Sequence, residues 1–182
     1  MTLDHLDNDE LLRLSLSAIE ANRDAEAISM LKEIVARQPD HFHAIYLLAA
    51  QHAQIGMFDR AESEFRAAVA LVPDFPVARF QLGQLLALSG RADEAREILQ
   101  PILEGRDAIG AYSRAIIALA ENRIDVGLRE IDEGLALPQP IPALTNDMHR
   151  LLQSLRDAEP ERAPVASAYF AGHGYGRAGG VE

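Results

Sequence analysis

Apolar residues along most of the chain fall three or four positions apart, which is the spacing of one face of an α-helix. One stripe of this kind ends shortly before Pro39 and consists of Ala27, Ile28, Leu31, Ile34 and Val35. Proline cannot continue a helical hydrogen-bond ladder, so the pattern predicts a helix that ends just before it. Similar stripes, separated by glycine, asparagine or proline, follow one another as far as residue 157. The pattern therefore predicts an all-α fold.

The pattern also repeats about every 34 residues. Gly-Met-Phe-Asp-Arg-Ala at 56–61 returns as Gly-Arg-Ala-Asp-Glu-Ala at 90–95, and weaker copies lie at 22–27 and 122–127. The small residues in this register are Ala27, Ala61, Ala95 and Gly127, at separations of 34, 34 and 32 residues. A period of this length is typical of stacked helical hairpins, whose usual role is to hold another molecule.

Each repeat is interpreted as two antiparallel helices that cross at small residues. The expected crossing positions are Ser15, Ala49, Gly83 and Ala115 on the first helices, and Ala27, Ala61, Ala95 and Gly127 on the second helices. Larger side chains there would push the helix axes beyond the usual separation of about 8–10 Å. The turn inside the first hairpin is placed at Asn22, because asparagine tolerates the left-handed conformation that ends many helices.

These positions resemble the signature of the tetratricopeptide-repeat family. The second repeat matches it best, at Leu48, Ala49, Gly56, Phe58, Ala61, Phe65, Ala68 and Pro73, and the third matches at Leu82, Gly83, Gly90, Ala95 and Leu99. The resemblance implies an all-α, right-handed solenoid of four helical hairpins over residues 8–140. It implies little about function.

The remaining segments complete the expected domain organisation. Residues 1–7 are an N-terminal extension, residues 141–158 a capping helix, and residues 159–182 a flexible Gly/Ala/Pro-rich tail. The capping helix has an apolar face made of Leu144, Met148, Leu151, Leu152 and Leu155. Such a helix solvates the end of a repeat stack. The aromatic residues of the tail either fold back into a groove or lie in solvent; they are Tyr169, Phe170 and Tyr175.

Pro101 interrupts the second helix of the third repeat. Inside a helix, proline removes one hydrogen bond and costs about 3 kcal/mol or produces a kink. The next repeat also begins two residues early. Two outcomes are open here, a local change of curvature or a slightly shortened helix.

Composition and charge narrow the class of partner. The formal net charge is −11, which argues against nucleic acid and against an anionic membrane surface as partners. No apolar run approaches the roughly 20 residues that span a bilayer. The absence of cysteine excludes disulfides and thiol catalysis and favours a cytoplasmic location. Of the 17 basic residues only Lys32 is lysine, a skew associated with GC-rich bacterial genomes.

The family resemblance also implies where a ligand would bind, because the first helix of each hairpin lines a concave groove in this family. The corresponding positions here are Leu12, Leu16, Ile19, Tyr46, Ala50, Ala53, Phe80, Gln84, Ala87, Tyr112, Ile116 and Leu119. Most are apolar, whereas family members that clamp a terminal carboxylate place Lys, Arg and Asn there. Tyr46, Phe80 and Tyr112 recur in register, so they form either an exposed aromatic ladder that docks a peptide or rings buried by neighbouring helices or the tail.

No catalytic, metal-binding or cofactor-binding residue is predicted. His41 and His43 flank a helix start, where histidines usually cap or face solvent, and Glu62 and Glu64 are expected on a solvent face. No glycine-rich phosphate loop follows a strand. The leading prediction is therefore a non-catalytic adaptor, chaperone or assembly factor that binds an apolar or amphipathic peptide. The alternatives are a self-associating structural module, such as a homodimer, and an accessory subunit of a separate enzyme.

Overall fold

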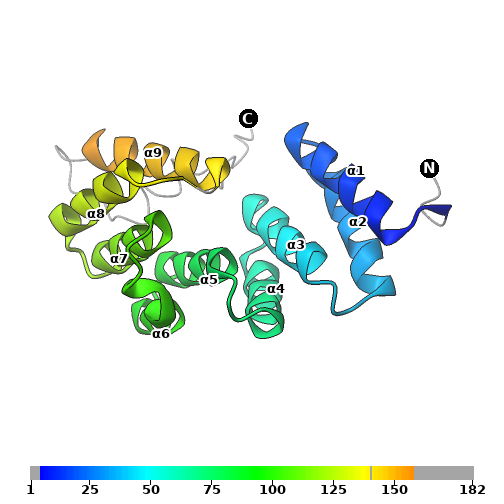
Figure 1. Cartoon of the computed structure of the whole chain (residues 1–182), viewed down its shortest axis with the longest axis horizontal. Helices are drawn as coiled ribbons and strands as arrows, with labels where there is room; N and C mark the ends of the chain where they lie inside the picture. Colours follow the sequence, from blue (N-terminus) through cyan, green and yellow to red (C-terminus); the bar gives the residue numbers. More distant parts are fainter. Residues whose placement is uncertain (1–4, 140, 158–182) are drawn as a thin grey trace, which may run out of the picture. The chain divides into compact units, whose positions relative to one another are not determined.

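A computed structural model of the chain describes residues 5–139 and 141–157, and within these residues it contains helices and no strands (Figure 1). The helices are α1 (Asn8–Glu20), α2 (Asp24–Arg37), α3 (Phe42–Gln54), α4 (Phe58–Leu71), α5 (Pro76–Leu88), α6 (Ala92–Leu103), α7 (Ala108–Ala120), α8 (Ile124–Ala136) and α9 (Pro142–Asp157). The prediction of an all-α fold of four helical hairpins and a final helix is confirmed. The tail at 159–182 and its three aromatic residues lie outside the described residues.

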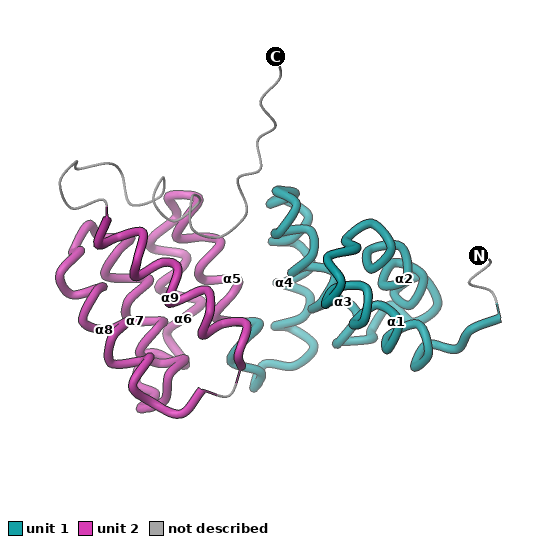
Figure 2. The backbone as a smooth tube through the Cα atoms, turned by 90° about the horizontal axis from the view of Figure 1, so that it is seen from above, with its two compact units in different colours: residues 1–78 teal, residues 79–182 magenta. Residues whose placement is uncertain are grey.

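The chain divides into two compact units, residues 1–78 and residues 79–182 (Figure 2). The first unit contains α1 to α4, which are the first two hairpins. The second contains α6 to α9 and all of α5 after its first turn. This division was not predicted from the repeat, which runs through the boundary without interruption.

Each hairpin turn uses one residue in the left-handed backbone conformation. These residues are Asn22, Gly56, Gly90 and Asn122, with φ between 54° and 79°. In every turn the next residue donates its N–H to the carbonyl five positions earlier, as in Arg23 to Ala18 at 2.8 Å. Glycine and asparagine tolerate this conformation best. The turn predicted at Asn22 is confirmed.

The small residues at the helix crossings are buried, as predicted. Ser15, Ala49 and Ala115 on the first helices are inaccessible to solvent, as are Ala27 and Ala61 on the second. At Gly83 an added Cβ would lie 2.4 Å from Cγ of Leu99, and at Gly127 it would lie 2.5 Å from Cδ2 of Leu119. The glycines therefore let a leucine of the partner helix fill the space beside the backbone.

The core of the first unit joins the two hairpins through α2 and α3. Leu11 of α1, Leu31 and Ile34 of α2, and Leu48 of α3 belong to one buried cluster. Phe42, Tyr46 and Phe75 form a second contact set, with ring centroids 5.0 to 6.2 Å apart. This aromatic packing ties the start of α3 to the segment that follows α4.

Helix α6 passes through Pro101 and ends two residues later, at Leu103. It has 12 residues, whereas α2 and α4 have 14 each. Of the two outcomes expected for Pro101, the structure shows the shortened helix. Because α6 ends early, the fourth repeat begins early in the sequence.

At the connection between α6 and α7, Gly110 has the closest contact with other backbone atoms of any glycine in the described chain. An added Cβ at Gly110 would lie 2.2 Å from the carbonyl oxygen of Gly105. Asp107 caps α7 by accepting a 2.8 Å hydrogen bond from the Gly110 N–H. Arg114 donates to the carbonyls of Leu103 and Gly105 at 3.0 Å each, so it satisfies carbonyls at the end of α6.

Helix α9 buries the apolar face that its sequence predicted. Leu144, Met148, Leu151, Leu152 and Leu155 are all buried. The helix packs against α8, and Arg156 pairs with Asp132 of α8 at 2.9 Å. The side chain of Gln139 accepts hydrogen bonds from Tyr112 and Thr145, so it connects α7 to the start of α9.

Replacing Gly110 by alanine should destabilise the chain by at least about 1 kcal/mol, because the methyl group meets backbone that cannot rotate away. The free energy of unfolding from urea denaturation measures this. Gln100→Ala on the exposed side of α6 is the control and should change it by less than about 0.5 kcal/mol. Equal stability of the two variants would contradict the contact.

Candidate protein-binding surface

In the first unit, α1 presents the most accessible of the predicted groove residues. Leu16 is 42 % exposed. Leu12 and Ile19, on the same side of the helix, are partly buried and pack against the core cluster. About two turns of α1 therefore offer a leucine to solvent between two anchored apolar neighbours. These three residues are called the α1 face below.

The predicted groove residues of α3 are less accessible. Tyr46 is half-buried, with its ring stacked on Phe42 and 5.3 Å from the ring of Phe75. Ala50 is partly exposed and Ala53 is buried. Tyr46 therefore serves mainly to pack the first unit, and only part of its ring is accessible to a ligand.

In the second unit, Phe80 and Tyr112 are buried and belong to the core. Phe80 is inaccessible and Tyr112 is 1 % exposed, with their ring centroids 6.4 Å apart. The Tyr112 ring lies against Gly134 of α8, where an added Cβ would be 2.4 Å from Cε1. The interpretation of these two rings as rungs of an exposed ladder is corrected, and burial by neighbouring helices is the correct alternative.

The other predicted groove positions of the second unit are also largely covered. Ile116 and Leu119 are buried, and Ala87 is half-buried. Gln84 is 8 % exposed, and its Nε2 has no hydrogen-bond partner among the described residues. The groove positions of the first unit other than Ala53 are therefore at least partly accessible, and those of the second unit are mostly buried.

His41 and His52 have hydrogen-bond partners that the sequence did not predict. His41 caps α3, since its Nδ1 accepts a hydrogen bond from the Ala44 N–H at 3.2 Å. His52 is buried and its Nδ1 lies 2.7 Å from Oε2 of Glu64. Glu64 was expected on a solvent face, but its side chain is only 23 % exposed because it reaches back to α3. The sequence gives no signal of this pair, because the two residues are 12 positions apart and lie on different helices.

No group of three histidine, aspartate or glutamate side chains among the described residues is arranged to hold a metal ion. None of the described helices is both long and apolar enough to cross a membrane.

Family models match two overlapping parts of the repeat region. Both carry the description tetratricopeptide repeat, one over residues 12–69 and the other over residues 52–114. The chain belongs to the tetratricopeptide-repeat family. As a member of this family it is a scaffold for protein interactions.

Curated relatives match this chain over part of its length. The mouse protein DnaJ homolog subfamily C member 3 is 31 % identical over 98 residues, which is 54 % of this chain and 19 % of that protein. Cellulose synthase operon protein C of Pseudomonas fluorescens (strain SBW25) is 31 % identical over 114 residues, 63 % of this chain and 9 % of that protein. The chain thus spans a fifth or less of the length of these relatives.

Solved structures share the fold over more of the chain. A structure titled MamA RS-1 ArsTM double mutant superposes with a TM-score of 0.60 at 18 % identity, covering 92 % of this chain and 93 % of that one. MamA MSR-1 C2 gives a TM-score of 0.60 at 19 % identity, covering 74 % and 78 %. At these identities the similarity establishes the helical-repeat fold.

Burial of Phe80 predicts that its truncation destabilises the protein. Phe80→Ala should lower the free energy of unfolding by about 3–5 kcal/mol, as for other buried aromatic residues. Leu16→Ala, at an accessible position, should lower it by less than about 1 kcal/mol. Urea denaturation followed by circular dichroism measures both. A small effect at Phe80 would restore the interpretation of its ring as exposed.

Burial also raises the pKa of the Tyr112 phenol above its ordinary value near 10. The folded chain therefore holds this proton more tightly than the unfolded chain, so stability is lost as the pH rises above about 10. Between pH 9 and 11, about one unit either side of the ordinary phenol pKa, the wild-type chain should lose stability more steeply than Tyr112→Phe. The variant has no phenol at this position to ionise. Parallel slopes in urea denaturation would contradict this.

Proposed function

We propose that the chain is a non-catalytic adaptor, chaperone or assembly factor that binds an apolar or amphipathic peptide segment of another protein. The observation that carries the proposal is the exposure of Leu16 between Leu12 and Ile19 on α1. Residues at these positions line the ligand groove in proteins of this family. The proposal narrows the docking region from all four repeats to the first unit.

The energetics of the α1 face suit a short apolar contact. Burying one leucine side chain contributes about 1.5–3 kcal/mol. Leu12 and Ile19 are already held by the core, so little conformational freedom is lost when a ligand covers them. Tyr46 and Ala50 of α3 would extend the contact, since both are partly accessible. An amphipathic helix with apolar side chains one turn apart fits this description.

The two alternative functions predicted from the sequence are tested by different experiments. Self-association through the α1 face would make the partner a second copy of the chain. Light scattering at several concentrations separates this from binding to another protein, because a homodimer dissociates on dilution. An accessory role would require co-purification with a separate enzyme. A cytoplasmic location and a bacterial source remain predictions from composition.

Leu16→Glu should weaken binding of a peptide selected on the wild-type protein by at least about tenfold, because the ligand would have to bury a carboxylate instead of a leucine. A displayed library of short peptides supplies the ligand, and fluorescence anisotropy gives the dissociation constant.

The matched control is Leu14→Glu in the same helix. Leu14 is 40 % exposed, almost the same as Leu16, but two residues along a helix place the two side chains about 200° apart. Leu14→Glu should leave the dissociation constant within about twofold. If both variants lose the peptide equally, or neither does, the α1 face is not the docking surface.

A further inference from the structure

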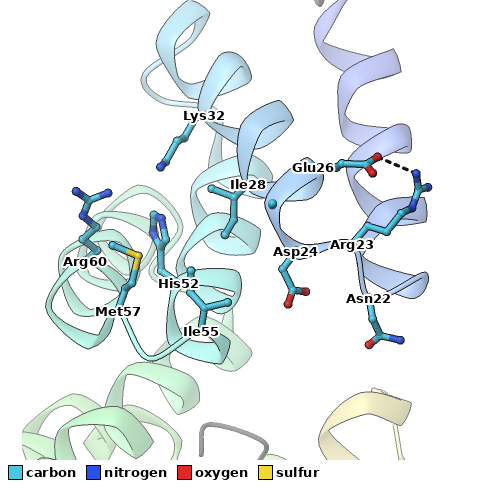
Figure 3. A pocket seen from close by; sticks show the side chains of 11 residues that line it. Asn22, Arg23, Asp24, Glu26, Ile28, Lys32, His52, Ile55, Met57 and Arg60 are labelled. Atoms are coloured by element: carbon cyan, nitrogen blue, oxygen red, sulfur yellow. Dashed lines mark hydrogen bonds and ion pairs between the residues drawn. The ribbon is translucent and has the colours of Figure 1, made fainter. Parts of the chain in front are cut away.

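A pocket of about 720 Å³ lies in the first unit, at the ends of the helices where the two hairpins meet (Figure 3). Its walls come from the turn before α2, from α2 itself, from the end of α3, and from the start of α4. It shares no residue with the α1 face. Its volume is within the range of about 300–1,000 Å³ that holds small ligands or a few side chains.

Part of the wall is apolar and accessible. Ile55 is 44 % exposed and Met57 is 36 % exposed, and they are among the few large apolar side chains of the described chain that are this accessible. Ile28 of α2 faces them and is partly buried. These three side chains offer an apolar surface that a ligand would remove from water.

One end of the pocket is cationic. Lys32 of α2 and Arg60 of α4 both line it, and Figure 3 shows their charged groups on the same side, above and beside His52. Neither has a hydrogen bond or an ion pair with another described residue. By contrast, Arg23 is paired with Glu26 at 2.7 Å. Besides Glu64, which lies 2.7 Å from His52 Nδ1, this end therefore carries two positive charges without an ion-pair partner among the described residues.

His52 supplies a buried polar atom at the same end. The residue is 1 % exposed, its Nδ1 is held by Glu64, and its Nε2 is buried without a hydrogen-bond partner among the described residues. A buried polar atom without a hydrogen-bond partner destabilises the folded chain. In Figure 3 the Met57 side chain lies beside the ring. Because methionine is flexible, a small movement of Met57 would bring Nε2 within reach of a ligand.

We propose that this pocket binds an acidic residue of a partner peptide together with an adjacent apolar side chain. The carboxylate lies between Lys32 and Arg60 and accepts a hydrogen bond from Nε2–H of the His52 imidazolium, whose Nδ1–H donates to Glu64. The apolar side chain covers Ile28, Ile55 and Met57. Asp24 also lines the pocket, but its carboxylate points away from the cationic end in Figure 3. A single carboxylate fits this arrangement better than a polyphosphate, because the acidic remainder of the chain repels a polyanion.

Three probes test the chemistry of the ligand. The first is a short fluorescent peptide that carries one Glu next to one Leu among uncharged residues and has an amidated C-terminus. The second has Gln in place of this Glu, and the third is the Gln peptide with a free C-terminal carboxylate. Wild type should bind the first peptide at least about tenfold more tightly than the other two. Equal binding of the Glu and Gln peptides overturns the proposal, as does preferential binding of the third, which would make the ligand a chain terminus.

Variants locate the binding. The double variant Lys32→Gln, Arg60→Gln should weaken binding of the Glu peptide by at least about tenfold, and Arg106→Gln, which removes an exposed arginine outside the pocket, should leave it within about twofold. Lys32 and Arg60 are exposed, so their replacement should leave the helical circular dichroism spectrum unchanged. An unchanged dissociation constant in the double variant overturns the proposal.

Two further measurements separate this site from the α1 face and detect contact directly. Leu16→Glu should still bind the Glu peptide with wild-type affinity, so failure of either proposal leaves the other standing. In NMR spectra, the ring ¹⁵N signal of His52 Nε2 should move when the Glu peptide is added and stay in place with the Gln peptide. A static His52 signal at saturation overturns the placement of the carboxylate.

Discussion

The close approach of the two helices within each hairpin is the constraint on which the rest of the structure depends. Each crossing uses small residues on both helices, such as Ala49 with Ala61 and Ala115 with Gly127. Where glycine is present, a leucine of the partner helix fills the space, so packing stays dense even though the backbones are near. This spacing fixes which side of each first helix faces its partner and which side is left for other contacts.

The consequences differ between the two units. In the first, α1 keeps Leu16 accessible while its opposite side packs on α2. In the second, Gly134 of α8 admits the ring of Tyr112, and Tyr112 in turn contacts Phe80. In the same register, the exposed Leu16 of the first repeat corresponds to the buried Ile116 of the fourth. Tyr112 is covered by α8, a second helix, whose residues the groove pattern of the first helices does not include.

Repeat register and side-chain accessibility are separate properties in this chain. The turns at Asn22 and Gly56, the buried small residues and the apolar face of α9 were all predictable, because each follows from local conformation or from helical periodicity. The accessibility of Phe80 and Tyr112 was not, because it depends on Gly134 and on residues after α8 such as Gln139. The pairing of His52 with Glu64 likewise joins two helices through side-chain geometry alone.

By itself, the sequence determined the helical hairpins, their order and the tetratricopeptide character of the chain, since these arise from short-range periodicity and turn chemistry. Only the tertiary structure decided which ligand-facing positions are accessible, how the shortened helix at Pro101 ends, and that Lys32, Arg60 and His52 line one pocket. Those features depend on contacts between residues distant in sequence. No local pattern specifies such contacts, because each is set by how neighbouring helices fill the space between them.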